Sequence, residues 1–469
     1  MGMKNVMDVI VIGGGPAGST VSTLLAKNGH KVALFERAHF PRDHVGESLL
    51  PYCYGIFEEL GVLDAMKETM TRKPGVRFID VDGKKKTTWC FSAVIKNDTH
   101  LSFQVRRDRF DHMLLRNSES NGVVVHEETK VSEVNLDGPE GTVVVTVIGP
   151  DGVASEHRSR FIVDASGRDT FLANRIGNKK KNQALDRAAL SQHWMDVPYE
   201  GGFDEGLIQI VYLGGEKKGW IWLIPVGANR LSIGIVVASD YYRGARQRLV
   251  DSGSSDWKRD FYLEELNSAP FVEGLLAGAT PVSELLVNGD YSYKSDVKYG
   301  ENFALVGDAH TFLDPVFSSG VYLSMNTARL VAGALHPWLS GEADSPLTDL
   351  KEVYTNIVGA YQLVEKSIML FYNPTAINFA QAASASDLIH ERHSNALASI
   401  HYVLAGDFFD NYDKYSKALD LLADPDLFAK YKSFVLDRPG YDAESCGMEF
   451  EEAFSEFQRN EVEPAPAVY

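Results

Sequence analysis

Residues 7–18 read MDVIVIGGGPAG, a short apolar run followed by glycines and a proline. The apolar run predicts a buried parallel strand. Pro16 is typical of a helix start, and the apolar periodicity continues to about Lys27. An Asn-Gly pair then ends the helix, and residues 31–36 (KVALFE) predict a second strand. The chain therefore opens with a β-α-β unit.

The glycines of this unit have the spacing Gly13-x-Gly15-x-x-Gly18, and Glu36 stands at the end of the second strand. Glycines let the backbone approach a pyrophosphate, the helix start offers N–H groups, and the acid binds a ribose hydroxyl. A plain glycine-rich turn is the alternative. Since strand, helix and acid all have their expected places, the pattern favours a dinucleotide site.

Composition limits the remaining possibilities. The 469 residues suffice for about three domain equivalents. The 46 basic and 64 acidic residues give a formal charge of −18, which disfavours nucleic acid as a partner. Three scattered cysteines predict neither a disulfide framework nor a metal site. No apolar run reaches membrane-spanning length, and the N-terminus lacks signal-peptide features, so we expect a soluble cytoplasmic enzyme without membrane partners.

Further segments predict two more kinds of structure. Strands are predicted at 123–134, 141–149, 160–167, 207–213, 220–225, 230–237 and 301–309, and helices at 320–339, 353–368, 379–405 and 412–436. The first two strand segments suggest a hairpin, and the three between 207 and 237 suggest an antiparallel meander. The helix at 353–368 is expected to end near Pro374, and the Pro-rich tail is expected to fray.

The predicted fold class is therefore α/β. A Rossmann-like nucleotide-binding module over residues 1–340 is interleaved with a mixed or antiparallel substrate sheet formed by about 75–105 and 185–290. A helical C-terminal region follows over residues 341–469.

Two later turns identify the nucleotide through a resemblance. DASG (164–167) and GDA (307–309) both follow strands, and with the N-terminal glycines they resemble the FAD-dependent aromatic hydroxylase fold over roughly residues 5–340. The resemblance implies that Asp308 contacts the flavin ribityl and phosphate region; a helix N-cap is the alternative. It also implies that Arg107 meets the flavin end, with a surface arginine as the alternative. No second such glycine pattern stands between a strand and a helix, so we expect FAD alone, reduced by a separate flavin reductase.

Within this fold, four segments resemble the flavin-dependent halogenases. They are residues 44–51 (HVGESLLP), 73–78 (KPGVRF), 220–225 (WIWLIP) and 312–320 (FLDPVFSSG). Their agreement in order makes the resemblance specific.

The resemblance implies roles for individual residues. Reduced flavin and oxygen convert a halide ion to hypohalous acid, which travels to Lys73 and halogenates an electron-rich ring. The amides of Ser319 and Gly320 hold the halide, and Trp220 and Trp222 keep organic substrate away from the flavin. Pro315 and Ser318 complete the halide and tunnel segment.

Each of these assignments has a structural alternative. Two tryptophans alternating on a strand are commonly core aromatics. Lys73 beside a Pro-Gly pair suits a solvated loop, and Ser318-Ser319-Gly320 suits a helix N-cap.

Departures from the family pattern bear on the substrate. Tryptophan halogenases carry a glutamate where this chain has Phe317, so the resemblance favours a phenolic or pyrrole ring, free or tethered to an acyl or peptidyl carrier protein. Lys84–Lys86 and Lys179–Lys181 suit an acidic carrier, although solvated loops that balance an acidic surface are the favoured interpretation of each. His310 replaces residues that are commonly small in the family.

Two other functions compete with halogenation. One is a flavin-dependent hydroxylase or reductase of the same fold. The other is a non-catalytic member that binds prenylated partners. The W-x-W-x-I-P segment with Lys73 disfavours the first, and the DASG and GDA turns disfavour the second.

Overall fold

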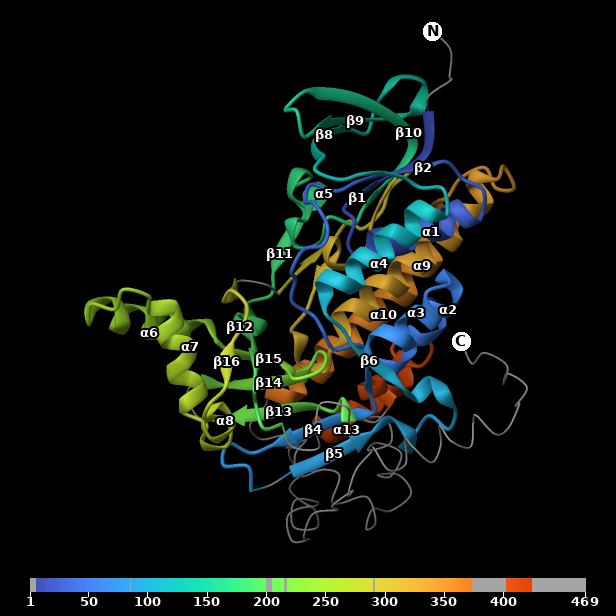
Figure 1. Cartoon of the computed structure of the whole chain (residues 1–469). Coiled ribbons are helices and arrows are strands. Elements are labelled where there is room, and N and C mark those ends of the chain that lie inside the picture. The colour runs from blue at the N-terminus through green and yellow to red at the C-terminus, as the bar shows by residue number, and fades with distance from the viewer. Residues whose placement is uncertain are drawn as a thin grey trace.

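The computed structural model describes residues 6–84, 86–199, 205–214, 217–289, 292–372 and 402–423. Two large sheets, two small ones and a set of long helices organise these residues (Figure 1). The predicted helix at 379–405 lies largely outside the described residues, as do residues 424–436 of the other predicted helix and the tail. Residues 412–423 are helical, as predicted.

The first sheet contains the N-terminal β-α-β unit, as predicted. Strand β1 (Val6–Ile12), helix α1 (Pro16–Lys27) and strand β2 (Val32–Phe35) follow one another, and β1 pairs in parallel with β2 and β10. The strand order is β7-β2-β1-β10-β9-β8, with β19 also paired to β10. The remaining strands are β7 (Val124–His126), β8 (Lys130–Asn135), β9 (Val143–Ile148), β10 (Ala154–Asp164) and β19 (Phe303–Leu305).

The predicted hairpin at 123–149 is only partly correct. Strands β8 and β9 do pair antiparallel, but β7 pairs in parallel with β2 instead of joining the hairpin. The backbone continues this pairing, because Glu36 N donates to His126 O and Thr129 N donates to Glu36 O. Strand β2 and Glu36 after it therefore pair with residues 124–129, the start of the expected hairpin.

The second sheet contains the predicted antiparallel meander of β13 (Ile208–Leu213), β14 (Gly219–Pro225) and β15 (Arg230–Ala238). Its order is β16-β12-β15-β14-β13-β4-β5, with β17 also on β12, and β13 pairs in parallel with β4. The other strands are β4 (Gly75–Ile79), β5 (Lys86–Cys90), β12 (Arg187–Met195), β16 (Thr280–Pro281) and β17 (Leu286–Gly289).

The two faces of the second sheet bury different cores. Trp220 and Trp222 on β14 face the main core, while Ile221 and Leu223 face a second cluster. That second cluster is covered by helices α6 (Ser239–Asp251), α7 (Trp257–Asn267) and α8 (Pro270–Leu276). The period-two alternation of a strand thus places both tryptophans on the side of the nucleotide module.

Helices α4 (Arg107–Ser120) and α9 (Ser319–Leu339) pack beside α1 (Figure 1). Helix α10 (Leu347–Tyr372) packs against α9 and α13 (Tyr412–Ala423), which confirms the amphipathic helix predicted at 353–368. The short elements are α2 (Tyr54–Leu60), α3 (Leu63–Thr69), α5 (Phe171–Arg175), β3 (Thr71–Lys73), β6 (Ser102–Gln104), β11 (Lys179–Lys181), β18 (Tyr293–Ser295) and β20 (Thr311–Phe312). Among the described residues, no helix has the length and apolar character needed to cross a membrane.

Candidate active site

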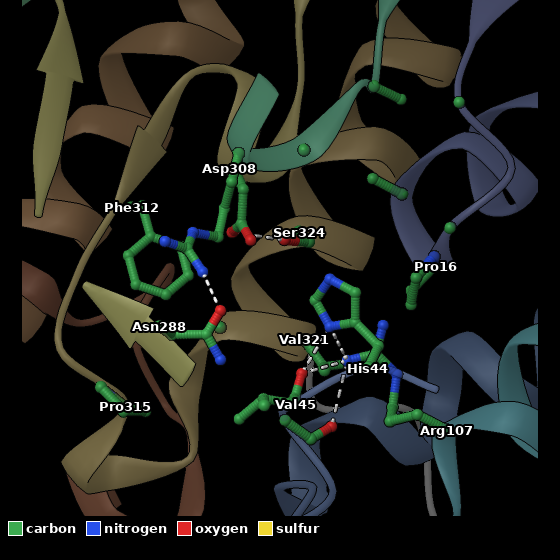
Figure 2. A pocket seen from close by; sticks show the side chains of 18 of the residues that line it. Pro16, His44, Val45, Arg107, Asn288, Asp308, Phe312, Pro315, Val321 and Ser324 are labelled. Atoms are coloured by element: carbon green, nitrogen blue, oxygen red, sulfur yellow. Dashed lines mark hydrogen bonds between the residues drawn. The ribbon is translucent and has the colours of Figure 1, made fainter. Parts of the chain in front are cut away.

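A cavity of about 750 Å³ lies where the glycine turn, the loop at 42–48 and strand β14 meet. Most of the residues singled out from the sequence line it. They are Gly13, Gly15, Glu36, Arg107, Trp220, Trp222, Asp308, Pro315, Ser318, Ser319 and Gly320. Residues up to about 300 positions apart in the chain therefore share one hollow. Figure 2 shows Arg107 beside His44 and Val45, and Asp308 beside Ser324.

The three glycines of the turn have different structural tasks. A Cβ on Gly13, whose φ is +99°, would lie 2.5 Å from the Ala165 carbonyl oxygen. A Cβ on Gly18 would lie 1.9 Å from the Gly13 carbonyl oxygen, so Gly18 allows helix α1 to pack on the turn. Among the described residues, a Cβ on Gly15 would meet only Arg42 Nη2, at 3.6 Å. Gly15 thus leaves open the space in front of the α1 N-terminus, where a pyrophosphate fits.

Glu36 is held in place by backbone amides at the end of β2. Its carboxylate accepts hydrogen bonds from Gly14 N at 2.7 Å and Ala38 N at 2.8 Å. The side chain is buried and lines the cavity. The fixed carboxylate keeps free lone pairs, which suits an acceptor for ribose hydroxyls.

Arg107 is buried at the start of α4, which excludes the surface-arginine alternative. Its guanidinium forms two hydrogen bonds with Asp111, at 2.7 and 2.8 Å, and Nη1 donates to Val45 O at 2.7 Å. Burial opposes its charge, but the contact with Asp111 holds the pKa of Arg107 above its ordinary value. A Cβ on Gly46 would lie 3.0 Å from Arg107 Nη1, so this glycine makes room for the guanidinium.

His44 belongs to the same network, and sequence reasoning did not single it out. Its ring lines the cavity beside Arg107, whose Nη1 lies 3.2 Å from His44 Nδ1. The ring is exposed to the open cavity. Desolvation there and the charge of Arg107 both lower the pKa of His44, which favours the neutral imidazole. The signal was present in the HVGESLLP segment, although its partners become visible only in three dimensions.

Asp308 lies in a 3₁₀ turn over residues 307–309 and caps no helix, so the N-cap alternative is wrong. Ser324 Oγ donates to its carboxylate at 3.4 Å. Burial raises the pKa of Asp308 to about 6, although Arg168 and Arg107 oppose that shift. A carboxyl group that titrates near neutrality at the cavity wall suits contact with the hydroxyl-rich chain of a flavin.

The two tryptophans are both core residues and cavity walls. Their ring centroids lie 5.7 Å apart with an angle of 46° between the planes. Trp222 Nε1 donates to Ser232 Oγ at 3.1 Å. A Cβ on Gly234 would lie 2.1 Å from the Trp222 ring, so the glycine on β15 is what admits the indole.

A hydrogen-bonded chain joins Trp220 to the loop before α9. Trp220 Nε1 donates to Tyr372 Oη at 2.8 Å, and Tyr372 Oη donates to Asp314 Oδ2 at 2.8 Å. Asp314 Oδ1 also accepts from Val316 N at 3.0 Å. Burial raises the pKa of Asp314 to about 6, partly offset by these hydrogen bonds. The wall and the loop are therefore one connected unit.

The loop ends in a left-handed residue, Ser318 with φ +56°, and α9 begins at Ser319. The first N–H groups of an α-helix have no partner within the helix. Ser319 and Gly320 bring these groups to the cavity, where they suit an anion. The helix start and the halide assignment are thus compatible. Phe317 is buried in the core and provides no carboxylate here.

Lys73 does not line the cavity; it ends β3 and is 1% exposed. Its Nζ donates to Leu49 O at 2.8 Å and lies 5.4 Å from the Phe91 ring centroid. Burial lowers the pKa of Lys73 to about 7. The solvated-loop alternative is therefore wrong, and Lys73 is a buried amine that titrates near neutrality.

The remaining candidates lie away from the cavity. Lys180 pairs with Asp296 and Lys181 with Asp186, so these surface charges on β11 are partly balanced. His310 is buried and lies outside the cavity lining; its ring centroid is 5.0 Å from that of Tyr361, which does line it. The part of the chain that the structure describes contains no cluster of three or more potential metal-ligating side chains.

Comparisons with known proteins agree with this geometry. The model of the FAD binding domain family matches residues 6–355. A tryptophan 2-halogenase of Chondromyces crocatus is 33% identical over 388 residues, which is 82% of this chain and 71% of the relative. A 1H-pyrrole-2-carbonyl-[peptidyl-carrier protein] chlorinase of Pseudomonas fluorescens is 29% identical over 347 residues, covering 70% of this chain and 75% of that protein.

Solved structures give the same result. The myxobacterial chondrochloren halogenase is 31% identical, with a TM-score of 0.72 over 90% of this chain and 97% of its own. A flavin-dependent brominase is 26% identical, with a TM-score of 0.75 over 91% of this chain and 99% of its own.

Proposed function

Because this chain belongs to the flavin-dependent halogenases, which bind FAD, we propose that it halogenates a phenolic or pyrrole ring through Lys73. The observation that supports the role of Lys73 is its burial, with a pKa of about 7. Its amine donates to the carbonyl of Leu49, the residue that follows the cavity-lining Ser48. When bound and reduced, FAD would supply two electrons and two protons, so that oxygen, a halide ion and one further proton give hypohalous acid and water.

The cavity residues have complementary tasks toward the cofactor. Gly15 and the N-terminus of α1 would hold the pyrophosphate, and Glu36 would hold the ribose. Arg107 and Asp308 would hold the flavin end, since both line the same cavity from different elements. The open space in front of Gly15 supports this assignment.

The loop before α9 would hold the halide. The amide groups of Ser319 and Gly320 offer positive potential without introducing a side-chain charge. Trp220 and Trp222 line the cavity on the side of the second sheet. There they would exclude an organic ring. A small neutral acid is thereby the only reaction product that needs to pass onward.

Lys73 would then receive the halogen in either of two protonation states. As an ammonium it donates a hydrogen bond to hypohalous acid and polarises the bond between oxygen and halogen. As a neutral amine it forms a haloamine, with the nitrogen–halogen bond replacing an N–H bond and water leaving. The aromatic carbon then takes the halogen, its proton is released, and the amine is restored. A pKa of about 7 populates both forms at neutral pH.

The substrate class follows from the loop and from the relatives. Phe317 supplies no carboxylate to assist proton removal from an indole, which favours phenolic and pyrrole rings. One relative is named for a pyrrole on a peptidyl carrier protein, which supports a tethered substrate. Another relative is named a tryptophan 2-halogenase, and this makes an indole the second candidate.

The partners follow from the chemistry. Reduced flavin would come from a separate reductase, and an acidic acyl or peptidyl carrier would present the ring if it is tethered. A supply of reduced flavin from nicotinamide cofactors suits the cytoplasm, which cell fractionation of the native host would test.

The direct experiment supplies the purified protein with FAD, a flavin reductase, and chloride or bromide. The acceptors are free phenols, free and carrier-tethered pyrroles, and free tryptophan, and products are identified by mass spectrometry. A halogenated phenol or pyrrole is expected. A halogenated tryptophan alone would contradict the substrate class, and a product that gains oxygen without halogen would make the chain a hydroxylase.

A further inference from the structure

A small sheet that contains Lys73 pairs with the segment that follows the cavity loop. Strand β3 pairs antiparallel with β6, which places Lys73 opposite Ser102. The other edge of β6 pairs with the segment that follows the cavity loop, with Ser48 opposite Gln104. Leu49 N donates to Phe103 O at 2.9 Å, which fixes this second pairing.

The pairing puts four polar side chains on one face of the small sheet. Directly opposed residues share a face, and so do residues two apart on one strand. Ser48 therefore neighbours Gln104, Gln104 neighbours Ser102, and Ser102 neighbours Lys73. The opposite face carries Phe103 and Arg72, whose guanidinium lies 4.9 Å from the Phe103 ring centroid.

Three oxygen atoms along this row lack a hydrogen-bond partner among the described residues: Ser48 Oγ, Gln104 Oε1 and Ser102 Oγ. The three side chains are 5%, 1% and 2% exposed, respectively. The Gln104 amide is held in orientation, because its Nε2 donates to Gly206 O at 3.0 Å. Buried oxygens without partners are costly, and a consecutive row of them indicates a small polar ligand.

The row begins at the cofactor cavity and ends beside Lys73. Ser48 lines the cavity. At the other end, Lys73 Nζ donates a hydrogen bond to the carbonyl oxygen of Leu49 at 2.8 Å. Leu49 is the residue next to Ser48. The cross-strand register therefore leads from a cavity-lining residue to the residue opposite Lys73.

We propose that Ser48, Gln104 and Ser102 form a polar track that passes hypohalous acid from the cofactor cavity to Lys73. The proposal rests on the function proposed above and names the residues of the passage. Hypohalous acid is small and neutral and carries one O–H donor, which each track oxygen accepts in turn. No covalent bond forms or breaks during transit. The Gln104 Oε1 atom can only accept a hydrogen bond, so this position disfavours a halide anion and favours the neutral acid.

The test measures where the halogen goes. For each reduced flavin oxidised, halogenated aromatic product is compared with halogen released to solvent, which a soluble 1,3-diketone captures; catalase removes hydrogen peroxide. Using a ratio corrects for any change in FAD binding. We expect the double variant Ser48→Ala/Ser102→Ala to shift the ratio about tenfold toward the solvent trap, the effect of losing roughly one ordinary hydrogen bond.

Two matched variants separate the track from general packing. Ser102→Thr keeps the hydroxyl and should keep a wild-type ratio. Ser22→Ala removes another buried Oγ without a partner among the described residues, on α1 and outside the cavity lining, and should also leave the ratio unchanged. A shift in Ser22→Ala as large as that in the double variant would overturn the proposal.

A second readout needs no turnover. A high-resolution crystal structure of the wild-type protein should show waters within hydrogen-bond distance of all three track oxygens, and the double variant should lose the waters at positions 48 and 102. The absence of waters at the three track oxygens in the wild-type protein would contradict the track. So would a double variant whose ratio of aromatic product to trapped halogen equals that of wild type. If Lys73→Ala still makes product, the proposed function itself fails; an inactive Lys73→Ala with an unchanged double variant removes only the track.

Discussion

The Nζ atom of Lys73 donates to the carbonyl oxygen of Leu49 at 2.8 Å, and Leu49 directly follows the cavity-lining residue Ser48. This contact joins two regions that the sequence presents separately, the HVGESLLP segment and the KPGVRF segment. It also fixes a buried amine behind the cavity wall, where bulk water does not compete. This placement supports halogen transfer through Lys73, because the amine is near the cavity and shielded from bulk water.

The glycine turn gives the first prediction. In Gly15→Val, the side chain should occupy the space in front of the α1 N-terminus, because Arg42 is the only neighbour of the Cβ position in the part of the chain that the structure describes. Flavin occupancy should fall below about a tenth of wild type while the fold is kept. Flavin absorbance and circular dichroism measure the two quantities. Gly18→Ala is the contrast, since its Cβ would lie 1.9 Å from a backbone oxygen and should destabilise the fold. A folded Gly15→Val with full flavin would remove this site assignment.

Lys73 should leave a signature in the pH dependence of stability. Burial lowers its pKa from the ordinary 10.5 to about 7, so the unfolded chain binds more protons than the folded one between these values. The free energy of unfolding should therefore gain up to about 4 kcal/mol from this group as pH rises from 7 to 10.5. Chemical denaturation at several pH values should show this gain in wild type and its loss in Lys73→Met. Parallel curves for the two proteins would show that the amine is not desolvated.

The tryptophan wall depends on the glycine opposite. In Gly234→Ala, the new methyl group would lie 2.1 Å from the Trp222 ring, so the indole must move. We expect a loss of about 1–3 kcal/mol in stability, as for other overpacked cores. We also expect hydroxylated product, because the aromatic ring of the substrate can reach the cofactor once Trp222 is displaced. Thermal unfolding and product mass spectrometry measure the two effects. Unchanged product with displaced Trp222 would show that the wall does not control chemistry.

The dependence on a separate reductase is also testable. The protein with FAD and NAD(P)H should oxidise the nicotinamide negligibly, and adding a flavin reductase should start halogenation. Absorbance at the nicotinamide band follows the first reaction. Rapid nicotinamide oxidation without a partner would show a binding site that the sequence pattern did not reveal.

Local sequence signals predicted much of the fold. The glycine spacing with Glu36 and the alternation in WIWLIP correctly placed β1, α1, β2 and β14, because these elements depend on short-range periodicity. The pairing of β7 with β2 was missed, since pairing is decided by distant backbone groups. The cross-strand neighbours Ser48, Gln104 and Ser102 were missed for the same reason.

The burial of Lys73 shows more clearly what local sequence patterns do not predict. Beside a Pro-Gly pair, a lysine suggests a surface loop, and only the pairing of β3 with β6 places it inside. The network of Arg107, Asp111 and His44 likewise combines a helix with a loop about sixty residues earlier. The sequence contains these residues, but their contacts arise from tertiary packing.

The most direct measurement compares wild type, Lys73→Ala and Lys73→Arg with reduced flavin, halide and an accepted ring. FAD binding and flavin reoxidation should stay close to wild type in both variants, while halogenated product disappears. Lys73→Arg should be nearly as inactive as Lys73→Ala, because a guanidinium keeps its proton and does not form a haloamine. Substantial halogenated product from Lys73→Ala, measured by mass spectrometry, would contradict a role for Lys73, and substantial product from Lys73→Arg alone would contradict the haloamine route.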